Sequence, residues 1–538
     1  MKKLVSRFMA VLMAMTMILS MSMTAFAAEA PKGTLTVNNT VAGKTLDLYQ
    51  IFTATKNGDN VAYTLNSAYE GFFKNNTRIP GSESLTGEAL SEKAYEYVKT
   101  QVGTDGKSGT GFAKEILGWI LENATTVATT HTTATTTAGS TVISGLEYGY
   151  YVVYPLGATD TSAAPGEQDY TSVASLVSVT GDTSINMKSN YPTVVKKVND
   201  KNADDVNIGD TVTYTLTSKV PDMTGYTSYV FNFKDTLSAG LTFKEITSVK
   251  VGETTITKVD AGQEADNTYT LTQDGQNITI TMNNFLASNK DNTGKEIKVT
   301  YTATLNKDAV TGFDANKNSA TVEYSNKPGT DNKGESEPSI VDVHTFNFTI
   351  FKYYLKDETK TGLAKAEFEL YKANEAGDAA DTNAKINIVK VKDGEYRQAT
   401  PEEAAAEGFK SDVIVSGTDG KVLVKGLDAG TYYLRETKAP EGYNKLLSDI
   451  KVEIKANYDE TTGKLTSYSV DYTYNGTTTT GTAITNKDNS PEVAVENKTG
   501  AQLPSTGSKG ALMVTLAGIV LFGALTASKA FGKKKAKN

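Results

Sequence analysis

A lysine at the end of an apolar segment is the first residue whose position suggests chemistry. Residues 346–352 read FNFTIFK, an alternation typical of a β-strand in which Phe348, Ile350 and Lys352 share one face. The two apolar side chains are expected to be buried, so Lys352 must point inward with them. Burial disfavours the charged form of an amine and lowers its pKa. A neutral lysine amine is a nucleophile, so this position predicts a reactive group.

A second segment carries a carboxyl group within a motif. Residues 432–443 read YYLRETKAPEGY and closely resemble the E-box, YxLxETxAPxGY, of CnaB-type domains in sortase-assembled pilins. Lys352 precedes this motif, and Asn486, in the strand-like segment 483–486, follows it. The resemblance therefore covers a whole C-terminal domain. It implies an intramolecular isopeptide bond between Lys352 and Asn486, with Glu436 as the acid.

The implied reaction explains why these residue types occur together. A buried carboxyl group has a raised pKa and stays protonated. Protonated Glu436 would donate a hydrogen bond to the side-chain carbonyl of Asn486 and stabilise the oxyanion as it forms. It would also carry the proton needed to expel ammonia. In the opposite interpretation, Glu436 is an ordinary surface carboxylate and Lys352 is a solvated strand lysine.

The middle of the chain shows a looser version of the same pattern. Lys196 alternates in phase with two valines, Asp235 lies in the segment KDTLSAGL, and Asn318 alternates in phase with apolar residues of a closing strand. This set resembles the CnaA-like second domain of backbone pilins, in which an aspartate replaces the glutamate. Lys197 and Asn326 are the alternative choices for the lysine and the asparagine.

The first part of the chain lacks these groups. Its opening strand-like segment, residues 34–37, has no lysine. Residues 145–151 echo residues 426–433 as a turn followed by a tyrosine-rich strand, but Tyr154 stands where the later segment has its acid. We expect no internal cross-link in the first domain.

Both ends of the chain carry targeting signals. Residues 1–27 combine basic residues, an apolar stretch and the small-residue site AFA, which is the pattern of a secretory signal peptide. Near the other end, an LPSTG pentapeptide is followed by an apolar run long enough to hold a helix in a bilayer and by a lysine-rich tail. The pentapeptide residues are Leu503, Pro504, Ser505, Thr506 and Gly507.

The order of these three C-terminal features resembles the sorting signal of sortase substrates, which is cleaved between threonine and glycine. The resemblance implies that Thr506 becomes a thioester and then an amide. A plain single-span anchor would explain the apolar run and the lysines but not the pentapeptide. The chain is therefore expected to be secreted and anchored to peptidoglycan in the cell wall.

Polymerising pilins also need a lysine that accepts the acyl group of the next subunit, often within a YPK motif. This sequence departs from that motif, because Tyr191 and Pro192 are followed by Thr193. Lys188 is the best-placed candidate, just before the middle domain. The alternative is that Lys188 is a solvated linker residue, and Lys197 is then the next candidate.

Composition excludes several other classes of function. The 538 residues include no cysteine and only two histidines, and the net charge is −8. An exported chain without cysteine cannot be held together by disulfides. The shortage of histidine argues against an enzyme and against a zinc site, and no cofactor or metal is expected. The net negative charge indicates no basic surface of the kind that binds nucleic acid.

Alternating strand-like segments punctuated by Gly, Asn and Asp predict a mainly β fold of tandem immunoglobulin-like, CnaA- and CnaB-like sandwiches. Residues 88–102 and 112–124 have helical periodicity and predict a helical insert in the first domain, with Trp119 as a packing residue. The expected divisions are a signal peptide, 1–27; three domains, 28–187, 188–343 and 344–488; a linker, 489–502; and a sorting signal, 503–538.

Together these features predict the backbone subunit of a covalent pilus that supports adhesion. Its expected partners are sortase, identical subunits, minor pilins and peptidoglycan. A monomeric wall-anchored adhesin is the alternative, because it would share the signals and the cross-linked domains.

Overall fold

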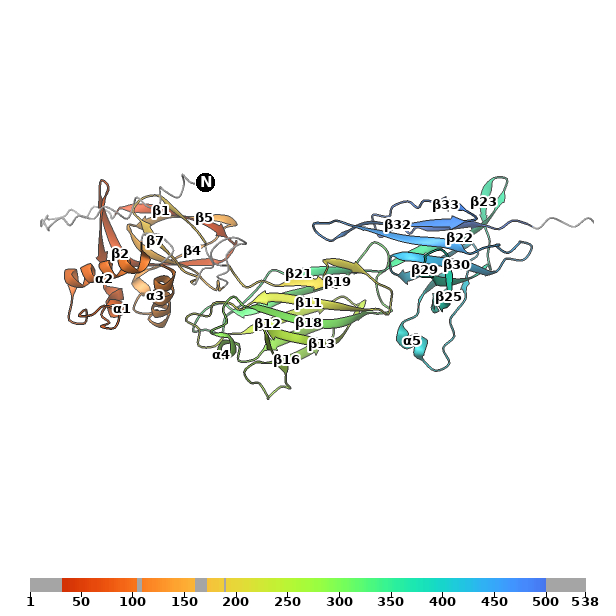
Figure 1. Cartoon of the computed structure of the whole chain (residues 1–538). Coiled ribbons are helices and arrows are strands. Elements are labelled where there is room, and N and C mark those ends of the chain that lie inside the picture. The colour runs from red at the N-terminus through yellow and green to blue at the C-terminus, as the bar shows by residue number, and fades with distance from the viewer. Residues whose placement is uncertain (1–30, 104–108, 160–171, 188–189, 500–538) are drawn as a thin grey trace, which may run out of the picture.

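The computed structural model describes residues 31–103, 109–159, 172–187 and 190–499, which form three bodies in chain order (Figure 1). Each body contains two β-sheets. The mainly β fold expected from the alternating segments is therefore confirmed.

The first domain has one sheet in the order β5-β1-β8 and another in the order β3-β2-β6-β7, with β4 paired to β2. Strand β1 joins its sheet between an antiparallel and a parallel neighbour. The strands are β1 (Lys32–Thr40), β2 (Thr45–Asn57), β3 (Asn60–Leu65), β4 (His131–Thr135), β5 (Gly139–Glu147), β6 (Gly149–Pro155), β7 (Ser175–Val179) and β8 (Thr183–Asn186).

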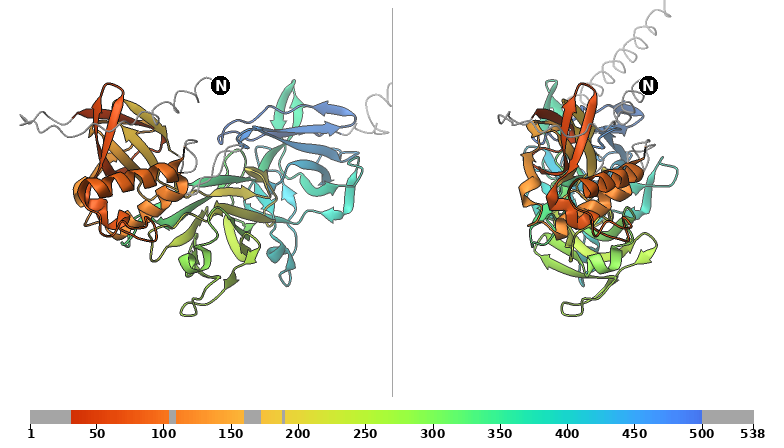
Figure 2. Two further views of the ribbon diagram at one scale, coloured as in Figure 1. Left: turned by 60° about the vertical axis from the view of Figure 1, so that its left-hand side comes forward. Right: turned by 90° about the vertical axis from the view of Figure 1, so that its left-hand side faces the viewer.

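The helical insert expected in the first domain is present as α1 (Glu70–Phe73), α2 (Gly87–Val102) and α3 (Thr110–Glu122). The helices gather on one side of this body (Figure 2). Their apolar side chains form one core with β2 and β6. The ring of Trp119 lies 5.8 Å from that of Phe72 and 6.1 Å from that of Tyr69. Trp119 is partly buried and packs against this core, as expected of a packing residue.

The middle domain is a sandwich of two sheets, ordered β14-β13-β18-β11-β9 and β10-β21-β19-β12-β17-β16-β15, with β20 paired to β19. Its elements are β9 (Val195–Val198), β10 (Ala203–Asp205), β11 (Thr211–Lys219), β12 (Phe231–Leu237), β13 (Leu241–Val251), β14 (Thr254–Thr255), β15 (Thr257–Lys258), β16 (Thr268–Asp274), β17 (Asn277–Met282), α4 (Phe285–Asn289), β18 (Glu296–Leu305), β19 (Asn316–Ser325), β20 (Lys333–Glu335) and β21 (Ser339–His344). Alternate side chains of these strands fill the space between the sheets.

The third domain has sheets in the orders β23-β22-β29-β27-β26 and β25-β24-β30-β31-β32-β33, with β34 paired to β22 and β28 paired to β24. Its elements are β22 (Phe346–Lys356), β23 (Thr359–Gly362), β24 (Glu367–Ala373), β25 (Ala380–Lys385), β26 (Ile388–Lys392), β27 (Glu395–Gln398), α5 (Pro401–Ala405), β28 (Ile414–Val415), β29 (Lys421–Leu427), β30 (Gly430–Lys438), β31 (Ile450–Tyr458), β32 (Leu465–Tyr474), β33 (Thr477–Thr479) and β34 (Glu492–Glu496).

Strand β34 extends the third domain past the boundary expected at residue 488. It runs parallel to β22, with Lys352 opposite Val495. Val493 and Val495 are buried in the domain core. The segment 489–499 therefore belongs to the folded domain, where a linker was expected.

The middle and third domains meet without a linker. Strand β21 ends at His344 and β22 begins at Phe346. Across the junction, Asp205 accepts hydrogen bonds from the backbone N–H of Ala429 (2.6 Å) and from the hydroxyl of Tyr458 (2.7 Å). Both strand continuity and these contacts hold the two domains in one orientation.

We expect Asp205→Ala to loosen this junction. Two donors at the interface would lose their acceptor, which costs about 1–3 kcal/mol for partly buried groups. Urea denaturation should show the loss of stability, and small-angle scattering should show a wider range of domain orientations. Asp204→Ala is the matched control, because Asp204 bonds Asn199 and Lys201 within the middle domain. Equal behaviour of the two variants would contradict the role of Asp205.

Candidate functional site

The structure brings together the three residues expected to react in the middle domain. Lys196 on β9, Asp235 on β12 and Asn318 on β19 point into the core, and each is at most 2% exposed. The Nζ of Lys196 donates a close hydrogen bond to Oδ2 of Asp235. Lys196 and the asparagine and aspartate come from opposite sheets, so the cluster spans the sandwich.

Tyr301 on β18 connects these three side chains. Its hydroxyl donates to Oδ2 of Asp235 (2.8 Å) and accepts from Nζ of Lys196 (2.8 Å). It also accepts from Nδ2 of Asn318 (2.7 Å). Sequence reasoning missed Tyr301, because one tyrosine among many alternating strand residues carries no distinguishing signal.

Burial pushes the amine and the acid of this cluster toward their neutral forms. It lowers the pKa of Lys196 to about 8, against the opposing attraction of Asp235. Burial likewise raises the pKa of Asp235, although Lys196 and Tyr301 favour its charged form. Oδ1 of Asp235 and Oδ1 of Asn318 are both buried without a hydrogen-bond donor. A proton on the aspartate would supply the donor that these two acceptors lack.

The third domain contains a similar pair. Lys352 on β22 and Glu436 on β30 have fully buried side chains, with Nζ and Oε1 3.1 Å apart. Nζ of Lys352 also lies 5.8 Å from the ring centre of Phe368. Burial lowers the pKa of Lys352 to about 8, although Glu436 acts in the opposite direction. The inward orientation of Lys352 and the burial of the E-box acid agree with the expectations from the sequence.

The structure does not bring Asn486 to this pair. Asn486 lies exposed in a turn, where its Oδ1 accepts from the backbone N–H of Asp488 and from Nδ2 of Asn489. The chain continues beyond this turn and returns as β34. The segment 483–486 is therefore not the closing strand of the domain.

Asn497, directly after β34, occupies the place expected for Asn486. It is 1% exposed, and its Nδ2 donates to Oε2 of Glu436 (3.2 Å). Its backbone N–H donates to the carbonyl of Tyr353, the residue after Lys352. A signal for it existed in the sequence: Val493, Val495 and Asn497 alternate just as Phe348, Ile350 and Lys352 do.

No equivalent cluster occurs among the described residues of the first domain. Among its described residues, the buried polar side chains include no lysine. Tyr154 is 1% exposed, and burial raises its pKa. On β2, Oδ1 of Asp47 lies 3.0 Å from Nε2 of His131.

Other sequence-based expectations lie outside the described residues. These are the signal peptide, Lys188 and the LPSTG pentapeptide. None of the helices in the described ranges has the length and apolar character needed to cross a membrane.

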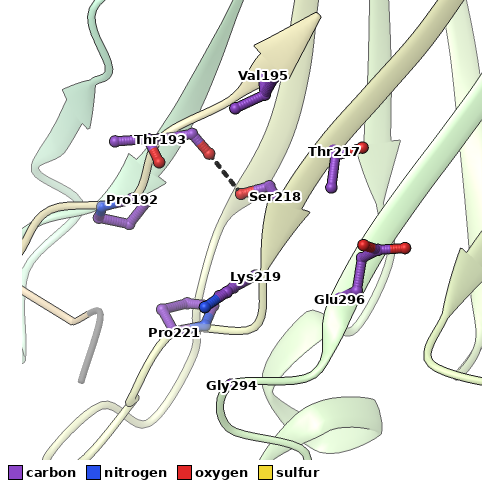
Figure 3. A pocket seen from close by; sticks show the side chains of 9 residues that line it. All are labelled: Pro192, Thr193, Val195, Thr217, Ser218, Lys219, Pro221, Gly294 and Glu296. Carbon is purple, nitrogen blue, oxygen red and sulfur yellow. Dashed lines mark hydrogen bonds between the residues drawn. The ribbon is translucent and has the colours of Figure 1, made fainter. Parts of the chain in front are cut away.

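A cleft of about 290 Å³ opens beside the start of β9 (Figure 3), and its lining residue Pro192 follows Lys188 by four positions in the sequence. Pro192, Val195 and Pro221 supply apolar walls, and Lys219 and Glu296 lie at its edges. Ser218 donates a hydrogen bond to the carbonyl of Thr193 (2.6 Å) and fixes one wall.

Two parts of the chain match models of known families. Residues 208–328 match a Gram-positive pilin backbone subunit 2, Cna-B-like domain. Residues 349–469 match the SpaA prealbumin-like fold domain. The first match lies within the middle domain and the second within the third domain. The middle region, expected to be CnaA-like, matches a model described as Cna-B-like.

Similar individual proteins are surface and fimbrial subunits. The trypsin-resistant surface T6 protein of Streptococcus pyogenes serotype M6 is 26% identical over 328 residues, covering 55% of this chain and 51% of that protein. Fimbrial subunit type 2 of Actinomyces naeslundii is 29% identical over 268 residues, covering 46% and 48%. The chain spans about half the length of these curated relatives. A solved structure of the T6 backbone pilin covers 88% of this chain and 100% of that one, at 17% identity and a TM-score of 0.45.

The lowered pKa of Lys352 predicts a pH dependence of stability in Asn497→Ala, in which Lys352 is left as a free amine. Between pH 8 and 10.5 the unfolded chain still binds a proton that the folded chain has lost, so stability rises with pH. The gain is up to about 3 kcal/mol. Urea denaturation at several pH values measures it. The double variant Asn497→Ala/Lys352→Met should lack this rise, and an equal rise in both would disprove the assignment.

Proposed function

We propose that the chain is the shaft subunit of a covalently polymerised cell-surface pilus, stabilised by two intramolecular lysine–asparagine isopeptide bonds. The observation that carries the proposal is the pair of buried clusters, each containing an amine, an acid and an amide. In the middle domain, the amine is that of Lys196, the acid is Asp235 and the amide is that of Asn318. In the third domain, the amine is that of Lys352, the acid is Glu436 and the amide is that of Asn497.

Each cluster contains what the cross-linking reaction needs. After the acid takes a proton from the ammonium group, the neutral Nζ attacks Cγ of the asparagine. The Nζ–Cγ bond forms, the attacking nitrogen gives up one proton and Nδ2 gains one, and the Cγ–Nδ2 bond breaks. Ammonia leaves and takes back the proton held by the acid, so an ammonium ion is released. The reaction consumes its own side chains once. The chain therefore acts as a structural subunit and not as an enzyme.

The positions of the two bonds suit a protein under tension. In the third domain, the bond joins β22, the first strand, to the residue after β34, the last strand. The bond in the middle domain joins β9, at its start, to β19, near its end. Each closes a loop of more than a hundred residues, which stabilises the folded state by about 5 kcal/mol in the chain-entropy model. Tension then passes through a covalent bond and not through the hydrogen bonds of a sheet.

Polymerisation requires that sortase join Thr506 of one subunit to a lysine of the next, and we assign this role to Lys188. A subunit joined at Lys188 would pull on the chain shortly before Lys196 in the sequence. The force would then pass through the Lys196–Asn318 bond and not through the first domain. The cleft beside Pro192 and Val195 offers an apolar surface near that position for the incoming chain. The last subunit would be transferred to peptidoglycan, and minor pilins would complete the fibre.

Intact-mass measurement tests the internal bonds in a chain spanning residues 28–502, which keeps every described residue. We expect a mass lower than the sequence mass by two molecules of ammonia. Asn497→Ala and Glu436→Ala should each lose one of the two bonds. Asn486→Ala is the matched control and should keep both, because Asn486 is exposed and bonds only its neighbours in the turn, Asp488 and Asn489, among the contacts described. An unchanged mass of the wild-type chain would refute the proposal.

The polymer itself is tested in a bacterium that carries the chain and its sortase. Wild-type cell-wall extract should give a ladder of very large species on a denaturing gel. Lys188→Arg should abolish the ladder and leave a wall-anchored monomer, because the sorting signal and both internal bonds are intact. Lys197→Arg is the control. A ladder that persists in Lys188→Arg would assign the acceptor to another lysine, and a single wild-type band would indicate a monomeric adhesin.

A further inference from the structure

The two clusters hold their asparagines in different ways. In the third domain, Nδ2 of Asn497 donates directly to Oε2 of Glu436 at 3.2 Å. Nδ2 of Asn318 in the middle domain donates to the hydroxyl of Tyr301 at 2.7 Å. That hydroxyl in turn donates to Oδ2 of Asp235. A tyrosine oxygen therefore stands between the acid and the amide in one domain only.

The length of the acid explains the difference. Aspartate has one methylene group fewer than glutamate, so its carboxyl group reaches less far from the strand. The phenol of Tyr301 extends that reach by one hydrogen-bonded oxygen. In the third domain, the backbone N–H of Leu446 supplies a further donor to Oε2 of Glu436 at 2.7 Å. Tyr301 supplies the matching donor to Asp235.

The surroundings fix the position of the Tyr301 hydroxyl. Tyr301 is fully buried, and its ring stacks on that of Tyr214 with centres 5.1 Å apart. Nζ of Lys196 lies 4.9 Å from the ring centre of Tyr214 and 5.2 Å from that of Tyr301. Burial, with the charge of Asp235, raises the pKa of Tyr301 well above its ordinary value. The phenol therefore stays protonated and available as a donor.

We propose that Tyr301 is a second catalytic residue of the middle-domain cross-link, beside Asp235, an inference that rests on the proposed function. Its oxygen lies 2.8 Å from the attacking Nζ of Lys196 and 2.7 Å from the leaving Nδ2 of Asn318. It orients the amide, and it relays a proton between the two nitrogens.

The proton balance of this step is complete. Asp235 first takes one proton from the ammonium group of Lys196, and the neutral amine attacks Cγ of Asn318. The attacking nitrogen must then lose a proton, and the leaving nitrogen must gain one. The Tyr301 oxygen receives the first proton while its own passes to Nδ2, so the phenol ends unchanged. Ammonia leaves and recovers the proton held by Asp235, and the ammonium ion is released.

The test is Tyr301→Phe in the 28–502 chain, made by cell-free synthesis and sampled over time. Digestion and mass spectrometry then measure the two cross-linked peptides separately. We expect the Lys196–Asn318 bond to form about a hundredfold more slowly, the lower range for proton transfer by a positioned side chain. The Lys352–Asn497 bond should form at the wild-type rate and reports that the chain has folded. Tyr324→Phe, another buried tyrosine of the same core, should leave both rates unchanged.

A second variant separates catalysis from a merely structural role. Asp235→Glu in the Tyr301→Phe background lengthens the acid to the form used in the third domain, and should recover about tenfold of the lost rate. A Tyr301→Phe rate within about twofold of wild type, or no recovery in the double variant, would overturn the role of Tyr301. If the wild-type chain forms no Lys196–Asn318 bond, the proposed function of the middle domain itself fails.

Discussion

The burial of a lysine amine beside a carboxyl group between two β-sheets is the interaction on which the middle and third domains are organised. Removing an ion pair from water is costly unless the geometry and hydrogen bonding are favourable. Both amines respond with lowered pKa values. The amide that joins the lysine to the asparagine would carry no charge, so cross-linking would permanently remove the cost of burying the charged amine. The apolar core therefore suits the uncharged amide better than the charged lysine from which the amide forms.

This constraint explains several otherwise unrelated features. The strands that carry the lysines must place them on the inner face, which the alternation of β9 and β22 achieves. Large aromatic side chains surround the amines and keep water away. The last strand of the third domain must also return beside the first, and the parallel pairing of β34 with β22 achieves this.

Much of this arrangement could be predicted from the sequence, because two-residue periodicity reports directly which side chains face the core. Lys196, Asn318 and Lys352 were found in this way, whereas Glu436 and Asp235 came from the resemblance of their segments to pilin domains. Asn486 was assigned wrongly as a neighbour of Lys352, since a short apolar segment ending in asparagine has the same pattern whether or not it closes the sheet. Asn497, which the structure places beside Glu436, directly follows β34, a strand with glutamates at both ends, so the segment resembled a linker. Tyr301 could not be predicted, because its role depends on which strands face each other across the sandwich.

The nearly seamless passage from β21 to β22 has a consequence for how a fibre would stretch. With both bonds formed, everything between Lys196 and Asn318, and between Lys352 and Asn497, would be shielded from extension. In a subunit linked through Lys188 and Thr506, the only segments that could extend under force would then be 188–196, 318–352 and 497–506. The longest of these stretches is itself paired into the sheets through β19, β21 and β22. Such a fibre would have a nearly fixed contour length, and a pulling force would reach the bacterium with little delay or damping.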